Sequence, residues 1–361
     1  MSSWGNWGNK IARASRPKKI PSQSRVLGID IVGYGPIGRE LSRKLALQPQ
    51  KYSVTSIADS SSVIYPKDSA QVLEIAKWKG EGNKLVDFKG DAKISAKDDL
   101  LQGLEFSSAS LVVDVTNSDY TKSEEARKRA IASLNAGKHF VAANKVALAF
   151  HYGEVFDVAK KKGLKIGYGA TIIGGRSAIA FIETQEESEV RQVNALLNSA
   201  TTMILSSLQS DPLLSIEEAI SRASKEGVLE RDPSIDLDGW DAAAKTAILS
   251  NCVFKEKQIT INDVQREGIQ GDLGKSLVEE QRKDPSKKVV RLVSEITKES
   301  ALVEPRLVDS SSSLGAGGHS GVVVFQMKDS EVSIRSTYNG SGVDVTSSVL
   351  LADISRIASQ T

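Results

Sequence analysis

The sequence predicts an α/β fold in its first half, built on a parallel, doubly wound sheet, and an α+β domain in its second half. Between about residues 26 and 168, short apolar runs alternate with helical patterns, as in parallel sheets with helical crossovers. After about Ala170 strand patterns predominate, which favours a mixed or antiparallel sheet. The last stretch, 346–359, has a helical pattern and is expected to return to the first domain.

The expected elements follow in order along the chain. In the first half, strands are expected at 26–32, 52–58, 110–115, 139–142 and 164–168, and helices after Gly33 through Leu47 and at 123–136, where Gly137 suits a C-cap. In the second half, strands are expected at 190–197, 258–261, 322–326 and 332–336, helices at 216–224 and 241–252, and a loop at 310–318. We expect a flexible basic tail (1–24), one domain from 25–170 with 340–361, and a second from 171–339.

Composition excludes several classes of protein. The 361 residues are 40% hydrophobic and 25% charged, which is typical of a soluble globular protein with room for two domains. No apolar stretch approaches the roughly 20 residues that span a bilayer, so we expect no membrane association. Cys252 is the only cysteine, which excludes an internal disulfide and favours a reducing, cytoplasmic location.

Charge is distributed unevenly along the chain. The net charge is +2, yet six basic residues precede Asp30, the first acidic residue. Such a tail is compatible with a targeting peptide or with contacts to nucleic acid. A solvated extension without a specific role is the simpler interpretation, so no nucleic-acid partner is expected.

A glycine motif predicts dinucleotide binding of the Rossmann type. Directly between an expected strand and an expected helix, the chain reads GxGxxG, with Gly33, Gly35, Pro36, Ile37 and Gly38. The first glycine allows a tight turn, the second a close approach to pyrophosphate, and the third close helix–strand packing. The alternative is a glycine turn that binds no ligand.

Cofactor choice stays open between NAD and NADP. Asp59 lies 21 residues beyond Gly38, at the end of the next expected strand, where an acid binds the adenosine ribose hydroxyls. That acid favours NAD, whereas Arg39 has the charge to attract the 2′-phosphate of NADP.

A second motif places charges on an apolar helix. Asp241 and Lys245 are four residues apart and share one helix face, and the residues around them up to Phe254 are largely apolar. A buried lysine is costly unless paired. The pattern therefore favours a polar site over an exposed surface pair.

Together these motifs resemble the homoserine dehydrogenase family, over about residues 27–358. The segments that carry the resemblance are 113–117, 137–145, 168–175, 340–342 and 346–353, with Gly227, Asp232-Pro233, Asp236, Gly239, Asp241 and Lys245 in the second motif. The resemblance implies a monofunctional member of the family, without the kinase half of the bifunctional enzymes and without a C-terminal regulatory extension. The resemblance implies a homodimer through the second-domain sheet and a place in threonine and methionine biosynthesis.

The resemblance also implies a reaction and residue roles. The family reduces aspartate 4-semialdehyde to homoserine with NAD(P)H, which requires a hydride donor and a proton donor. Lys245 would be the general acid and base and Asp241 its orienting partner. Glu230 and Asp236 would hold the substrate ammonium group, and Lys145 would face the reacting oxygen, the substrate carboxylate or the nicotinamide ribose. Thr116 and Asn117 would line the cofactor on its nicotinamide side, and Gly340, in the closing glycine loop, would also bind the cofactor.

The chain departs from the family pattern at three places. Gly169 replaces a glutamate that helps relatives hold a monovalent cation, so only carbonyls such as those of Ile172 and Gly174 remain as cation ligands, and no metal is expected. Val228 replaces a tyrosine, and Ala200 lies where relatives have polar contacts, with Thr201 or Thr202 as candidate replacements. Two alternatives follow: a related NAD(P)-dependent oxidoreductase acting on another small amino acid or aldehyde, and a non-catalytic nucleotide-binding protein.

Overall fold

A computed structural model describes most of the chain: residues 26–96, 100–172, 175–186, 189–211, 213–226, 229, 232–284, 287–337 and 342–360. The expected tail lies outside the described residues, as do Gly174, Val228, Glu230 and Gly340.

A seven-stranded sheet forms the first half, in the order β4-β3-β2-β1-β5-β6-β7. Its strands are β1 (Leu27–Val32), β2 (Tyr52–Ala58), β3 (Ser62–Tyr65), β4 (Lys93–Ala96), β5 (Leu111–Asp114), β6 (His139–Ala142) and β7 (Ile166–Gly167). Five strands, β2, β1, β5, β6 and β7, pair in parallel, and β1 lies between β2 and β5. The α/β fold with a Rossmann-type sheet is therefore confirmed.

One edge of this sheet departs from the expected all-parallel arrangement. β2 pairs with β3, and β3 with β4, in antiparallel fashion. β3 follows β2 after a turn of only a few residues, which is too short for a parallel crossover.

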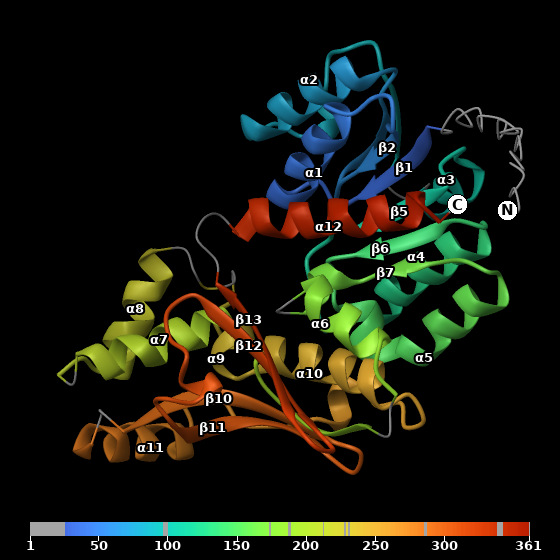
Figure 1. The fold of residues 1–361 in the computed structure, drawn as a ribbon. Helices are drawn as coiled ribbons and strands as arrows, with labels where there is room; N and C mark the ends of the chain where they lie inside the picture. The colour runs from blue at the N-terminus through green and yellow to red at the C-terminus, as the bar shows by residue number, and fades with distance from the viewer. Residues whose placement is uncertain are drawn as a thin grey trace, which may run out of the picture.

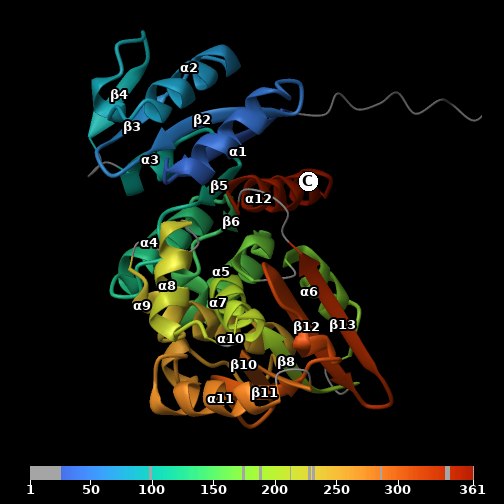
Figure 2. The ribbon, with the colours of Figure 1, turned by 90° about the vertical axis from the view of Figure 1, so that its left-hand side faces the viewer.

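Helices cover both faces of the seven-stranded sheet (Figures 1 and 2). They are α1 (Pro36–Ala46), α2 (Ser69–Gly80), α3 (Leu100–Phe106), α4 (Ser123–Asn135) and α5 (Val146–Lys161). Apolar side chains of α1 and α2 share one core cluster with Ile29, Ile31 and Val113, whereas α4 and α5 share another with Val112 and Phe140. Neighbouring residues of one strand thus serve opposite faces, which is why the strands are continuously apolar.

A mixed six-stranded sheet forms the second half, in the order β13-β12-β8-β10-β11-β9. Its strands are β8 (Val190–Leu196), β9 (Gln265–Arg266), β10 (Lys288–Thr297), β11 (Ala301–Asp309), β12 (Ser320–Met327) and β13 (Glu331–Thr337). All pairs are antiparallel except β11 with β9, so the expected mixed or antiparallel sheet is confirmed.

The strand expected at 258–261 is wrong. Both backbone polar groups of Ile259 bond to the side chain of Asn251, each at 2.7 Å, instead of to a neighbouring strand. Thr260 then caps a single helical turn, Ile261–Asp263. Side-chain hydrogen bonds thus replace the ladder that a strand would need.

Helix α10 (Trp240–Val253) lies in the centre of the molecule. It packs against α5, α9 (Ser234–Leu237), β10 and β11, and nearly all its residues are buried, including Asp241. Other helices of the second half are α6 (Gly175–Glu183), α7 (Ser199–Ser210), α8 (Ile216–Lys225) and α11 (Asp272–Lys283). The burial predicted for the helix that carries Asp241 and Lys245 is therefore present.

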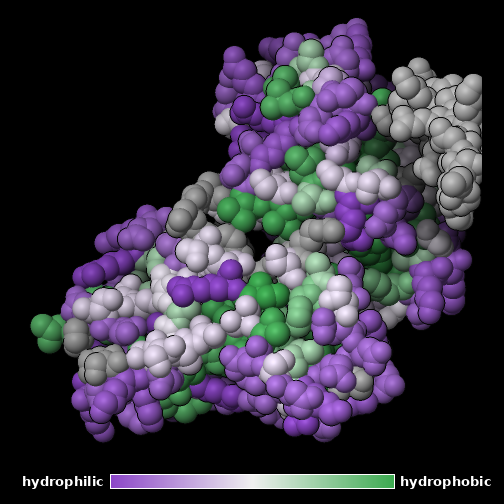
Figure 3. Space-filling view, in the orientation of Figure 1, coloured by the Kyte–Doolittle hydropathy of each residue, from purple (hydrophilic) through white to green (hydrophobic). Residues whose placement is uncertain are grey.

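The C-terminal helix α12 (Gly342–Ala358) returns to the first sheet, as expected. It lies along α1 and contacts β6 and β7, at the boundary between the two sheets (Figure 1). In the space-filling view, hydrophilic residues cover most of the visible surface, and a hollow opens between the upper and lower parts of the molecule (Figure 3). None of the helices in the described ranges is both long and apolar enough to cross a bilayer.

Candidate active site

The glycine loop follows β1 and forms a cradle at the start of α1. Gly33 has a φ of +100°, and a Cβ there would lie 2.6 Å from the backbone nitrogen of Thr116. A Cβ on Gly38 would lie 2.2 Å from the carbonyl oxygen of Gly33, whereas one on Gly35 would meet nothing within 4 Å. Gly33 and Gly38 therefore allow a close approach of backbone segments, and Gly35 leaves open space beside the backbone.

The start of α1 has the features of an anion site. Gly35 is the N-cap without a capping side chain, Pro36 follows, and the first turn holds no acidic residue. The free amides and the positive end of the helix dipole therefore face the space that Gly35 leaves open. These residues fit the pyrophosphate of a dinucleotide.

Asp59 follows β2 at the expected place, but protein partners occupy its carboxylate. Oδ1 accepts hydrogen bonds from the amide and hydroxyl of Ser61 at 2.7 and 2.6 Å, and Oδ2 lies 2.6 Å from Nζ of Lys79. Burial alone would raise the pKa of Asp59, but the hydrogen bonds from Lys79 and Ser61 and the charge of Lys79 hold it below its usual value. Asp59 therefore forms an ion pair with Lys79.

A second cation, Arg39, reaches the last turn of α2. A Cβ placed on Gly80 would be 2.7 Å from an Nη atom of Arg39, so the Arg39 guanidinium covers the last turn of α2, next to Lys79. The sequence offered no signal for Lys79. Lys79 pairs the acid expected at the adenosine ribose with a cation, and Arg39 lies at the same end of α2, which favours tolerance of a phosphate.

A buried polar frame fixes the loop after β5. The hydroxyl of Thr116 donates to Asp114 at 2.6 Å and accepts from Arg129 and Asn144 at 3.0 and 2.8 Å. Asn144 also donates to the carbonyl of Asn117 at 2.9 Å. The amide of Thr116 also donates to Asp114 at 3.0 Å, so both its side chain and its amide are committed to this frame.

The predicted lysines meet at one carboxylate. Nζ of Lys245 lies 2.6 Å from Oδ2 of Asp241, and Nζ of Lys145, from the residue before α5, lies 3.3 Å from Oδ1. The side chain of Asp241 is 6% exposed and those of the lysines about 15%. Burial alone would raise the pKa of Asp241, but the charges of both lysines and hydrogen bonds from Lys245 and Asn198 lower it to about 2. A carboxylate between two ammonium groups stays ionised and holds both in place.

Asn198 joins this cluster, although the sequence analysis did not select it. Its Nδ2 donates to Oδ1 of Asp236 at 2.7 Å and to Oδ2 of Asp241 at 3.0 Å. Lys245 also donates to the carbonyl of Leu197 at 2.8 Å. An Asn that precedes an apolar helical run is a helix-start signal, so the position of Asn198 was accessible from sequence, whereas its contacts were not.

Thr201 lies in the first turn of α7, one residue beyond Ala200, and both are buried. Its amide donates to Oδ1 of Asn198 at 2.8 Å and its hydroxyl to the Asn198 carbonyl at 3.1 Å. The hydroxyl of Thr202 donates to the same carbonyl at 2.9 Å. Both candidate replacements thus lie next to the acids but use their protons within the helix.

Aromatic stacking ties the first sheet to the start of α10. Tyr120, in the loop after β5, stacks on Trp240 with ring centroids 6.4 Å apart. On Trp240 the guanidinium carbon of Arg266 lies 3.7 Å from the ring centroid, and Arg266 also donates to the carbonyl of Asp238. Trp240, the residue before Asp241, is therefore held in place by contacts with both Tyr120 and Arg266.

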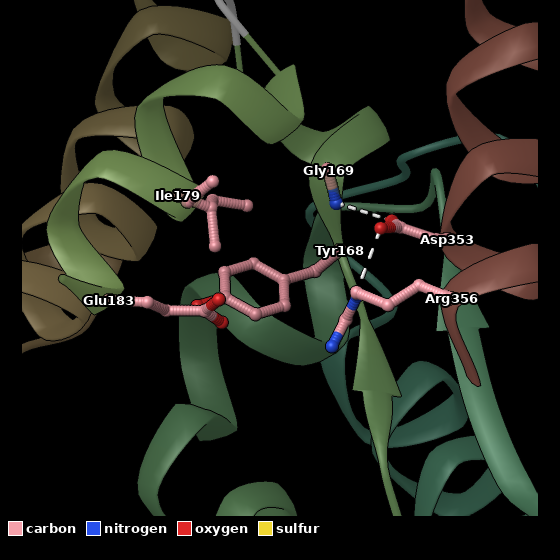
Figure 4. A pocket seen from close by; sticks show the side chains of 7 residues that line it. Tyr168, Gly169, Ile179, Glu183, Asp353 and Arg356 are labelled. Carbon is pink, nitrogen blue, oxygen red and sulfur yellow. Dashed lines mark hydrogen bonds and ion pairs between the residues drawn. The ribbon is translucent and has the colours of Figure 1, made fainter. Parts of the chain in front are cut away.

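The crossover strand is anchored to α12. Asp353 accepts a hydrogen bond of 2.8 Å from the amide of Gly169 and lies 4.0 Å from Arg356 (Figure 4). The cavity beside Tyr168, of ≈ 10 Å³, has room for about one water.

Across the described ranges, no three His, Cys, Asp or Glu side chains are grouped to hold a metal. The possible cation site at Ile172 and Gly174 is untested, because Gly174 lies outside those ranges.

Fold and site together define a nicotinamide-dinucleotide-dependent oxidoreductase. The family model "Homoserine dehydrogenase" matches residues 179–355, and "Homoserine dehydrogenase, NAD binding domain" matches residues 33–169. The chain belongs to the homoserine dehydrogenase family, which confirms the resemblance read from the motifs.

Known proteins similar to this chain include one named for NAD(+) dependence and one solved with NADPH. It is 28% identical over 343 residues to homoserine dehydrogenase of Methanocaldococcus jannaschii, covering 93% of this chain and 99% of that protein. It is 25% identical over 345 residues to NAD(+)-dependent homoserine dehydrogenase of Pseudomonas canavaninivorans, covering 91% and 95%. A solved hyperthermophilic archaeal homoserine dehydrogenase in complex with NADPH is 26% identical, with a TM-score of 0.78 and coverage of 93% and 98%.

Proposed function

We propose that this protein interconverts aspartate 4-semialdehyde and homoserine with NAD(P)(H), and that Lys245 is its general acid and base. The observation that carries the proposal is the cluster of Lys245, Lys145 and Asp241, assembled from α10 and the residue before α5. The bound dinucleotide supplies the hydride for reduction and accepts it in oxidation.

Lys245 has the free donor that the role requires. An ammonium group has three N–H donors, and within the described part of the chain two of them bind Asp241 and the carbonyl of Leu197. The third is available to the substrate oxygen. Lys245 would give its proton to the aldehyde oxygen during reduction and take it from the hydroxyl during oxidation.

Asp241 and Lys145 support this proton transfer. Asp241 fixes the Lys245 ammonium from one turn earlier on the same helix, which removes rotamer freedom from a flexible side chain. The ammonium group of Lys145 pairs with the other carboxylate oxygen of Asp241, so it belongs to the same cluster as Lys245. It would bind the substrate carboxylate or the reacting oxygen.

The acids beside the cluster suit an amino-acid substrate. Asp236 is buried beside Asp241, and we assign the substrate ammonium group to Asp236 and Glu230. For the cofactor, Gly33, Gly35, Pro36, Ile37 and Gly38 would receive the pyrophosphate, Asp59 would lie at the adenosine ribose, Asn117 would lie on the nicotinamide side, and Gly340 would be a further cofactor contact.

The second candidate is an oxidoreductase with the same proton chemistry and another small substrate. Ala200 favours it, because a buried methyl group occupies the first turn of α7, two residues after Asn198, which binds both acids. The test is product analysis: NADPH or NADH oxidation with aspartate semialdehyde, beside a panel of other small amino-acid aldehydes. Homoserine formation at the highest kcat/KM supports the proposal; turnover of another aldehyde alone would establish the second candidate.

The resemblance also supports a homodimer through the six-stranded sheet, which light scattering tests. A reducing cytoplasm remains our expectation for location, because Cys252 is the only cysteine of the sequence.

A further inference from the structure

We propose that Asn198 is a positioning residue that binds the carboxylates of Asp236 and Asp241 together, and so couples the substrate-ammonium subsite to the proton donor. This inference rests on the proposed function. Asn198 lies between β8 and α7 and is the N-cap residue of α7.

The geometry places one amide between two acids. Nδ2 carries two hydrogens, one directed at Asp236 over 2.7 Å and the other at Asp241 over 3.0 Å. All three residues are nearly fully buried. Two carboxylates repel one another at low dielectric, and a donor group shared between them offsets that repulsion.

Capping fixes the orientation of this amide. Oδ1 of Asn198 accepts the backbone N–H of Thr201 at 2.8 Å, so a flipped amide would turn its NH2 group against another donor. The NH2 group therefore has to face the acids. Asp241 in turn pairs with Lys245 and Lys145. Asn198 is therefore the residue that connects Asp236 to Asp241 and its two lysines.

The competing explanation is that Asn198 is only a helix cap. Ser and Asp cap helices as well as Asn does, so a capping role alone predicts that Asn198→Ser and Asn198→Asp are tolerated. A positioning role predicts the opposite, because Ser lacks the paired donors and Asp replaces them with an acceptor. The two variants therefore separate the explanations at one position.

The experiment compares full-length wild type, Asn198→Ser, Asn198→Asp and a matched cap control, Asp68→Ala. Asp68 caps α2 by accepting from Gln71, far along the chain from the acids. We expect kcat/KM for homoserine to fall roughly 10-fold in Asn198→Ser, which keeps one hydroxyl donor, and roughly 100-fold in Asn198→Asp, which replaces both donors with an acceptor. The control should lose stability and keep kcat/KM.

A pH profile distinguishes positioning from general damage. The groups facing Asp241 are Lys245 on α10, Lys145 before α5, Asn198 before α7 and, across Asn198, Asp236 on α9. In Asn198→Asp, protonating the introduced carboxyl restores one donor, so its deficit relative to wild type should shrink as the pH falls. Values within threefold of wild type for both variants, with unchanged profiles, would overturn the inference.

Acid unfolding decides the matter independently of the substrate. If wild type fails on homoserine and aspartate semialdehyde, the proposed function is wrong, and this readout still tests Asn198. Its hydrogen bond contributes to the low pKa of Asp241, so Asn198→Ser should lose less stability than wild type between about pH 4 and pH 2. An equal loss would contradict a bond between Asn198 and an ionised Asp241.

Discussion

The ammonium group of Lys245 lies 2.6 Å from Oδ2 of Asp241, one turn earlier on the same helix. On an exposed helix such a pair is worth a few tenths of a kcal/mol. Here both side chains are largely buried on a helix that packs against both parts of the molecule. The pair is therefore an internal element of the site, and its disruption should have large effects.

We expect Asp241→Asn to destabilise the fold by about 3 kcal/mol, because it leaves two buried ammonium groups without their counter-ion. Urea unfolding measures the change. The double variant Asp241→Asn with Lys145→Met should regain part of the loss, since only one unpaired cation remains. Equal stability of the wild type and the single variant would show that the lysines are solvated in the absence of Asp241.

The low pKa of Asp241 makes stability depend on acid. A carboxyl whose folded-state pKa is about 2 instead of 3.8 stabilises the protein above its ordinary value, and this contribution is lost as the pH falls toward 2. The share of Asp241 is about 2 kcal/mol at neutral pH. The fall in the free energy of unfolding between pH 4 and pH 2 should be smaller in Asp241→Asn by this amount.

Lys79 should set the balance between the two cofactors. In Lys79→Ala the Asp59 carboxylate loses its cation and would repel a 2′-phosphate while it binds ribose hydroxyls. We expect affinity for NADPH to fall about fivefold relative to NADH, as suits a partly exposed ion pair. Fluorescence titration of both nucleotides measures this ratio, with Lys77→Ala, an exposed lysine of the same helix, as control.

Two glycines of one motif should respond differently to the same methyl group. Gly35→Ala places its Cβ in open space, so we expect unchanged stability but roughly 10-fold weaker dinucleotide binding. Gly38→Ala drives its Cβ against the backbone of Gly33 and should cost about 1–3 kcal/mol of stability. Thermal unfolding and nucleotide titration separate the two effects. Unchanged dinucleotide binding in Gly35→Ala would show that the pyrophosphate does not bind at this loop.

Periodicity was enough to predict the elements with strong local signals. The strand at 139–142 and the helix around Asp241 and Lys245 appear where the pattern placed them. The longest strand pair of the molecule, β10 with β11, was not predicted. Pro305 interrupts the pattern of β11, and the structure accommodates it where β9, which pairs only with Leu302 and Val303, no longer borders the strand.

The site was predictable to the extent that its residues lie in local motifs. The spacing of Asp241 and Lys245 defines a helix face, and the glycines define a turn. Lys79 and Asn198 carry no such spacing, because their partners lie far away along the chain, at Asp59 and at Asp236 and Asp241. Only the assembled sheets bring these residues together.

The most direct measurement of the central claim is kcat/KM for homoserine oxidation in wild type and Lys245→Ala. Lys255→Ala, an exposed lysine just beyond the same helix, is the matched control, and nucleotide affinity is titrated in each protein. The proposed role predicts a loss of about 10²–10⁴-fold in Lys245→Ala, with nucleotide affinity retained and the control unchanged. Comparable rates in wild type and Lys245→Ala would contradict it.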